Sequence, residues 1–350
     1  MADKRNYNID LLRILAALAV VTIHVSAKQM YQAEISSIRW MTYNLYDSAV
    51  RWAVPVFVMI SGSFLLDPAH TLSPKKLYTQ NLLRIITAFF CWSTVCALGN
   101  VLILKKPTDS LLKDIVFGPD YLWFLYMIAW LYIITPLLRK ITLHKRLTTI
   151  VTAVLLLITS VIPTIFRFIS NAENARVDKI FNEKGDYFML FGATGAMYIG
   201  VYLLGYMLSA AMLKKPVRIL LYVAGILSWL LTVWLAYRYS RLSSEQDLRF
   251  YNYLTVNVLI ESCAVFVLLR HLPIRWNEKT KRIITAVSRD SFGVYLVHII
   301  VLNILHRLGL RTTLFPAFLS IPVISVLVFA VSLGVSAVLN RIPVLKKYIV

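Results

Sequence analysis

The sequence predicts an all-α, polytopic integral membrane protein with about ten transmembrane helices. Hydrophobic residues fill 59% of its 350 positions and charged residues only 15%, and the mean hydropathy is +0.69. Soluble globular chains contain about 25% charged residues, so this composition is not theirs. Apolar stretches long enough to cross about 30 Å of hydrocarbon recur along the whole chain.

Ten such stretches follow one another without a Gly/Ser-rich or Pro-rich linker and without an obvious repeat. We therefore expect residues 1–350 to form a single integral-membrane domain. In chain order, the predicted spans are 9–27, 49–66, 81–104, 121–138, 147–166, 188–212, 217–237, 252–269, 289–306 and 315–339. The first also resembles a signal peptide, but Arg13 interrupts its apolar run, so we expect it to be retained.

The distribution of basic residues predicts the orientation. The N-terminus, the even-numbered loops and the C-terminus carry 20 of the 37 Lys and Arg residues, the odd-numbered loops carry 14, and Arg13, Arg51 and Arg84 lie inside spans. Because basic loops stay in the cytoplasm, both termini are expected there. The longest outward loops, 28–48, 105–120 and 167–187, are candidates to roof a site that opens outward.

The formal net charge of +20 does not indicate a nucleic-acid partner, because basic residues beside membrane spans account for it. For the basic loop 270–289, attraction to anionic lipid is favoured over a ligand site. The three cysteines, Cys91, Cys96 and Cys263, lie within predicted spans and show no metal-ligand spacing, so neither a disulfide nor a metal site is expected. The sequence lacks the catalytic motifs that are typical of soluble enzymes. Any catalytic residues are therefore isolated polar groups inside the spans.

Arg13 and His24 are the most informative of these groups. They lie eleven residues apart in the first span, and at about 1.5 Å and about 100° per residue they share one helix face about 16 Å apart. Asp10 lies on the same face and is expected to pair with Arg13. Ionisable residues inside a span usually face a cavity or the protein interior. Taken alone, His24 fits an interhelical hydrogen bond slightly better than a general base, although its pKa range suits proton transfer.

Four other polar residues within the predicted spans are candidate site residues. Arg84 fits a snorkelling residue and a fixed charge for phosphate equally well. Asn257 and Glu261 are four residues apart and share a helix face, so their spacing allows a hydrogen bond between them or a cavity lined by both. Glu261 fits a structural partner of an arginine better than a catalytic acid. His298 stands in an apolar run and is more typical of a satisfied core histidine.

Several short strings occur in a characteristic order. They are Asp10-Leu11-Leu12-Arg13 followed by His24, 54–62 (VPVFVMISG), 122–125 (LWFL) with 132–138 (YIITPLL), and 291–298 (SFGVYLVH). Together they resemble the acyltransferase family 3 membrane proteins of bacteria over essentially the whole chain. Ser63 departs from the pattern, since an aromatic residue is expected after Gly62.

The resemblance implies acyl transfer, usually of acetyl, from cytoplasmic acyl-CoA to a hydroxyl of a carbohydrate or another acceptor outside the bacterial cytoplasmic membrane. It assigns the catalytic pair to Arg13 and His24 and the arginine of the third span to Arg84. Some members carry a carboxy-terminal esterase-like domain; this chain ends at Val350, so we expect it to complete the transfer itself or to pass the acyl group to a separate protein.

From these residues we expect the phosphates of acetyl-CoA to bind Arg13, Arg84, Lys75 and Lys76. His24 is then the general base or, as the less favoured alternative, a transient acyl carrier. Trp123 and Tyr295 are candidate oxyanion donors, and Glu261 and His298 are candidate cavity residues.

The main alternative is a transporter or flippase for a polar small molecule or a lipid-linked sugar, because buried charges can also line a translocation path. Uptake into liposomes without consumption of acyl-CoA would favour it. A purely structural membrane partner would leave Arg13 and His24 without a role.

Overall fold

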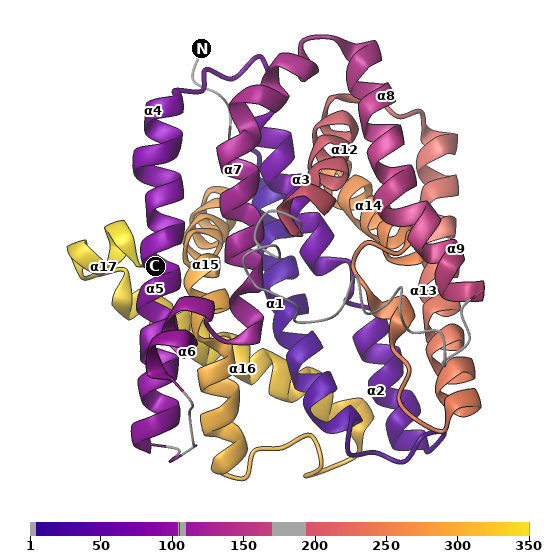
Figure 1. Ribbon diagram of the computed structural model, residues 1–350, viewed down its shortest axis with the longest axis vertical. Helices are drawn as coiled ribbons and strands as arrows, with labels where there is room; N and C mark the ends of the chain where they lie inside the picture. Colours follow the sequence, from indigo (N-terminus) through magenta and orange to yellow (C-terminus); the bar gives the residue numbers. More distant parts are fainter. Residues whose placement is uncertain (1–4, 104, 106–109, 170–193, 350) are drawn as a thin grey trace.

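The computed structural model describes residues 5–103, 105, 110–169 and 194–349. Every regular element in these ranges is a helix, which confirms the all-α prediction (Figure 1). The α-helices are α1 (Tyr7–Met30), α2 (Ile38–Ser48), α3 (Ala53–Leu65), α4 (Pro74–Lys76), α5 (Leu83–Leu98), α6 (Leu111–Phe117), α7 (Trp123–Thr142), α8 (Lys145–Leu156), α9 (Ile162–Ile169), α12 (Ile199–Ala210), α13 (Lys215–Ser243), α14 (Val256–Arg270), α15 (Glu278–Arg307), α16 (Ala317–Leu339) and α17 (Pro343–Tyr348).

Short irregular helical segments connect some of these elements. The π-helical segments Leu77–Leu82, Gly99–Ile103 and Leu157–Val161 continue neighbouring α-helices, and 3₁₀ turns occur at Asp120–Leu122 and Arg249–Tyr251. As a result, α4 and α5 form one long helix, as do α8 and α9.

Within the described ranges, nine helices are long and apolar enough to cross a membrane, and the chain is a multi-pass membrane protein. A shorter apolar helix, Thr194–Ala210, lies where the sixth span was predicted. Residues 188–193 of that span and residues 170–187 of the preceding loop lie outside the described residues.

Several spans begin earlier than predicted. Among them, three helices start at Ile38, Pro74 and Glu278, whereas the apolar runs start at 49, 81 and 289. Polar caps set these starts: the side chains of Ser37, Ser73 and Asn277 each accept a hydrogen bond from the backbone of the first helical turn. The loops predicted at 28–48 and 270–289 are therefore partly helical, because hydropathy detects only the apolar part of a helix.

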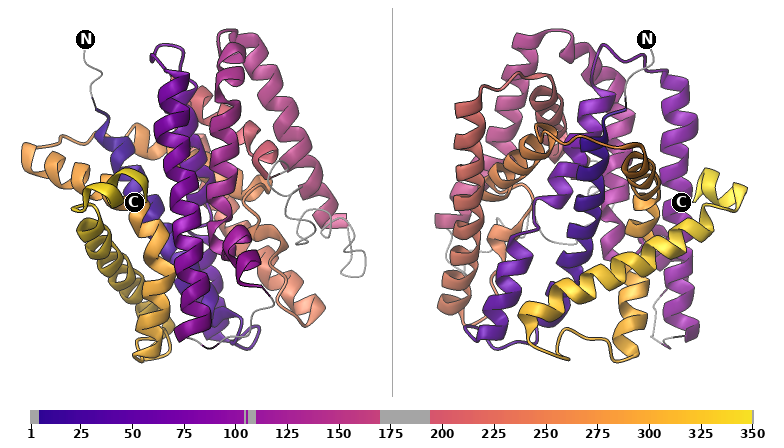
Figure 2. Two further views of the ribbon diagram at one scale, coloured as in Figure 1. Left: turned by 60° about the vertical axis from the view of Figure 1, so that its left-hand side comes forward. Right: turned by 180° about the vertical axis from the view of Figure 1, so that it is seen from behind.

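Helix α1 lies at the centre of the bundle (Figure 1) and contacts α2, α3, α14, α15 and α16. Figure 2 shows α16 crossing one side of the bundle obliquely, with α17 projecting beyond it. On the peripheral helix α13, Leu220 is 70% exposed and Leu227 is 60% exposed. Such exposed leucines on a long apolar helix are typical of a lipid-facing surface.

Helices α3 and α12 approach each other at backbone distance. A Cβ atom built on Gly205 would lie 2.3 Å from the Met59 Cα, and one built on Gly62 would lie 1.9 Å from the Tyr202 carbonyl oxygen. Glycines allow membrane helices to pack this closely. We call the side on which α1 begins the N-terminal side, where α3 ends and α4 begins, and the other the opposite side (Figure 1).

Candidate functional site

A cavity of about 470 Å³ lies against α1 and is also lined by α3, α5, α7 and α15. Arg13, Arg84 and Arg289 line it, while no carboxylate does so among the residues that the structure describes. His24, Trp123 and Tyr295 line it as well. Because His24 lies eleven residues further along α1 than Arg13, the cavity has a cationic part toward the N-terminal side and an aromatic part around the imidazole. We call it the central cavity.

Arg13 is held by its neighbours at the cationic part. Its Nη1 lies 3.6 Å from the Asp10 Oδ1, so the ion pair predicted from their spacing is confirmed. Nη1 also lies 3.4 Å from the Ser288 Oγ, which itself donates to the Asp10 Oδ1 at 2.9 Å. One third of the Arg13 side chain stays exposed, so the guanidinium is oriented and accessible.

His24 projects into the other part of the cavity, next to a second histidine. The ring centroids of His24 and His298 lie 5.1 Å apart. His298 is fully buried, and its Nδ1 lies 2.6 Å from the carbonyl oxygen of Tyr295. A carbonyl only accepts hydrogen bonds, so Nδ1 carries the proton and Nε2 is left as an acceptor. Within the described residues, that buried Nε2 has no hydrogen-bond partner.

The two candidate oxyanion donors differ in availability. The Tyr295 hydroxyl already donates to the Tyr121 carbonyl oxygen at 2.5 Å. The Trp123 ring stacks on Tyr253, with a centroid separation of 5.9 Å and an interplanar angle of 21°. Trp123 is therefore the better placed donor of the two.

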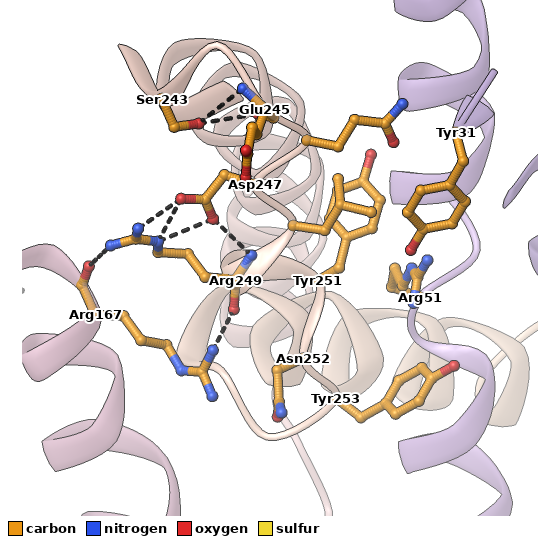
Figure 3. A pocket seen from close by; sticks show the side chains of 12 residues that line it. Tyr31, Arg51, Arg167, Ser243, Glu245, Asp247, Arg249, Tyr251, Asn252 and Tyr253 are labelled. Carbon is orange, nitrogen blue, oxygen red and sulfur yellow. Dashed lines mark hydrogen bonds and ion pairs between the residues drawn. The ribbon is translucent and has the colours of Figure 1, made fainter. Parts of the chain in front are cut away.

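Two further pockets adjoin the central cavity, since each shares a lining residue with it. A pocket of about 430 Å³ on the N-terminal side is lined by Arg5, Asp10, Arg13 and Arg270, among others, and shares Arg13. A pocket of about 490 Å³, formed around Arg51 and the segment that follows α13, shares Tyr253 (Figure 3). The two pockets and the central cavity therefore follow one another across the bundle, from the N-terminal side toward the opposite side.

One known protein family matches nearly the whole chain that forms this cavity. The sequence model of the acyltransferase domain matches residues 6–341, nearly the whole chain. The chain belongs to acyltransferase family 3. It is a membrane acyltransferase. Comparisons with curated proteins and with solved structures give no match.

The acyltransferase brings only some of the predicted site residues together. Arg13, His24, Arg84, Trp123 and Tyr295 line one cavity, and His298 supports it from behind His24. Lys75 and Lys76 lie exposed on α4 and line none of the three pockets.

Glu261 is also absent from the three pocket walls. It is buried on α14, and the hydrogen bond with Asn257, one of the two roles that their spacing allows, is not formed. The Asn257 Nδ2 instead donates to the Thr232 Oγ1 at 2.7 Å and to the Phe250 carbonyl oxygen at 2.9 Å. Tertiary partners on α13 and in the preceding turn thus satisfy the amide.

Two arginines that line these pockets had no predicted role. Arg289 lines the central cavity, with its Nε 2.9 Å from the Asp290 Oδ1, and in the sequence it is only a basic residue at the edge of a span. Arg51 was one of three arginines inside spans and received no role. Its position inside an apolar run was the available signal, as it was for Arg13.

Proposed function

We propose that this acyltransferase moves an acetyl group from cytoplasmic acetyl-CoA to a hydroxyl of a carbohydrate or similar acceptor at the outer face of the bacterial cytoplasmic membrane. The observation that supports this best is the central cavity, which has three arginines toward one side of the bundle and His24 further along. Coenzyme A is an anion, so its phosphates would lie at the arginines and its thioester beyond them.

The separation of Arg13 and His24 along α1 agrees with this placement of coenzyme A. Arg13 and His24 are separated by eleven residues of α1, which corresponds to about 16 Å along the helix axis. Arginine suits phosphate because its planar fork of donors binds the oxygens in pairs. Arg84 also lies over the Phe292 ring at 5.2 Å, which orients its guanidinium at the cavity wall.

In the proposed reaction His24 accepts the proton of the acceptor hydroxyl as the hydroxyl oxygen attacks the thioester carbonyl carbon. The bond between carbonyl carbon and sulfur then breaks, and the thiolate of CoA leaves with the proton that His24 returns. The Trp123 indole N–H is our candidate for stabilising the intermediate oxyanion. No covalent enzyme intermediate is needed.

The donor half of the proposal predicts the effect of removing an arginine. Arg84→Gln and Arg289→Gln are each expected to raise the KM for acetyl-CoA by about 10-fold or more, since a charged hydrogen bond contributes about 1.5–3 kcal/mol. The release of CoA measured against acetyl-CoA concentration tests this. Arg282→Gln is the matched control, because Arg282 is exposed on the same helix, α15, and does not line the cavity. Equal KM values in all variants would contradict the proposed donor site.

His298 is expected to act as a positioning residue for His24. If a His24 N–H donates to the free Nε2 of His298, the other His24 nitrogen faces the cavity as a base. His298→Leu is expected to lower kcat by about 10²-fold through misplacement of His24, with an unchanged KM for acetyl-CoA. His298→Gln, which retains polar atoms, should recover part of kcat, and the pH profile of kcat should shift between the two variants. Equal kcat values for His298→Leu and the wild type would exclude this role.

The experiment that tests the whole function compares cells lacking the gene with complemented cells. Mass spectrometry of surface polysaccharide, lipid-linked sugars and small metabolites should reveal O-acetyl groups that depend on the gene. The same acetylated species in both strains would contradict the proposal.

A further inference from the structure

The pocket beyond Tyr253, which we call the outer pocket, is not used by the donor. Its walls come from four parts of the chain: Tyr31 after α1, Arg51 between α2 and α3, Arg167 on α9, and residues 243–253 (Figure 3). Its volume of about 490 Å³ lies within the roughly 300–1,000 Å³ of small-molecule sites.

The arginines of the outer pocket are matched by carboxylates. The Arg51 Nη2 lies 2.7 Å from the buried Asp47 Oδ1, and the Arg249 Nη2 lies 2.5 Å from the Asp247 Oδ2. Arg167 donates to the Arg249 carbonyl oxygen at 2.7 Å, and Glu245 adds a further carboxylate to the pocket wall. Counting Asp47 behind Arg51, three guanidinium groups and three carboxylates lie at the pocket among the residues that the structure describes. A pocket with many hydrogen-bonding groups and little net charge suits a hydroxyl-rich, uncharged ligand better than an anion.

Aromatic rings complete the pocket. The Arg51 guanidinium lies 4.4 Å from the centre of the Tyr251 ring. Tyr253 belongs to the outer pocket and to the central cavity. Tyr31 is 65% exposed at the rim. The Tyr251 hydroxyl donates to the Asn44 Oδ1 at 2.5 Å, whereas the exposed Tyr31 ring can pack on the C–H face of a sugar while its hydroxyl binds the sugar oxygens.

We propose that the outer pocket binds the acceptor as an uncharged sugar unit, and that Tyr253 marks the passage through which one hydroxyl of that sugar reaches His24. This inference rests on the proposed function, because it assigns the second substrate of the same reaction. It adds a binding site for the acceptor and a preference for an uncharged acceptor. Neither follows from the central cavity.

Binding of two simple probes tests the inference without the natural acceptor. Saturation-transfer NMR is recorded with methyl β-D-glucopyranoside and its acidic counterpart, methyl β-D-glucuronide, on the protein in lipid nanodiscs. Maltoside detergents are avoided because they carry sugar. The wild type is expected to favour the neutral glycoside, and Tyr31→Ala is expected to lower its signal several-fold.

A charge reversal provides the matched comparison. Glu245→Lys replaces a negative by a positive charge at an exposed position of the wall and so raises its net charge by two, and the preference is expected to shift several-fold toward the glucuronide. Glu34→Lys is the control, because Glu34 is exposed in the turn between α1 and α2 and does not line the pocket. The inference is overturned if the wild type favours the glucuronide, if neither probe binds, or if Tyr31→Ala and Glu245→Lys behave as Glu34→Lys does.

The donor reaction is measured on the same preparations. Binding of acetyl-CoA with no discrimination between the glycosides would reject the outer pocket and leave the proposed function standing. Sugar binding without any binding of acetyl-CoA would reject the proposed acyl donor instead.

Discussion

His24→Ala is expected to lower kcat for acyl transfer by about 10²–10⁴-fold, the usual contribution of a general base. The imidazole lines the central cavity and has a neighbour, His298, that can hold its orientation. The arginines are untouched by the change, so the affinity for acetyl-CoA should stay within about twofold of the wild type. Transfer of radiolabelled acetyl to an acceptor in membranes measures kcat, and calorimetry measures donor binding.

The comparison needs a histidine outside the cavity. His306→Ala serves as the control, because His306 lies near the end of α15 and lines none of the three pockets. Full acyl transfer by folded His24→Ala protein would remove His24 from the mechanism. An acetylated His24 trapped before an acceptor is added would replace the base with an acyl carrier.

Gly205→Val is expected to destabilise the fold by about 3 kcal/mol or more, since overpacking against backbone leaves no side chain free to move away. The new Cβ would lie 2.3 Å from both the Cα and the carbonyl oxygen of Met59, so α12 could not stay against α3. A lower melting temperature and aggregation during size-exclusion chromatography would report the loss.

Gly334→Ala provides the opposite case. Nothing lies within 4 Å of a Cβ built on this α16 residue, and alanine is favoured over glycine in a helix by about 0.5–1 kcal/mol. Its melting temperature should equal or exceed that of the wild type. If Gly205→Val were as stable as Gly334→Ala, the contact between α3 and α12 would not be as close as described.

The sequence predicted the helical class because apolar length is a local property, and helical periodicity placed Arg13 and His24 on one face. The structure then brings Arg84, Trp123 and Tyr295 to the same cavity, while their chemical roles stay predictions. Lys75 and Lys76 lie exposed instead, because charge and proximity to a span do not fix which side of a helix a side chain occupies.

The outer pocket could not be predicted from the sequence. Its residues come from segments more than 200 positions apart, such as Tyr31 and Tyr251, and only their packing brings them together. Helical periodicity placed Asn257 and Glu261 on one face of α14, but it could not show that the Asn257 amide bonds Thr232 and the Phe250 carbonyl oxygen instead.

The position of Arg13 has a consequence for bioenergetics. The proposed reaction takes one substrate from each face of the bilayer, which would offer protons a leak through the enzyme. Arg13 lines two adjoining pockets. A fixed guanidinium in a water-filled passage repels protons and metal cations. The residue proposed to bind the donor phosphates would thereby also limit proton leakage between turnovers.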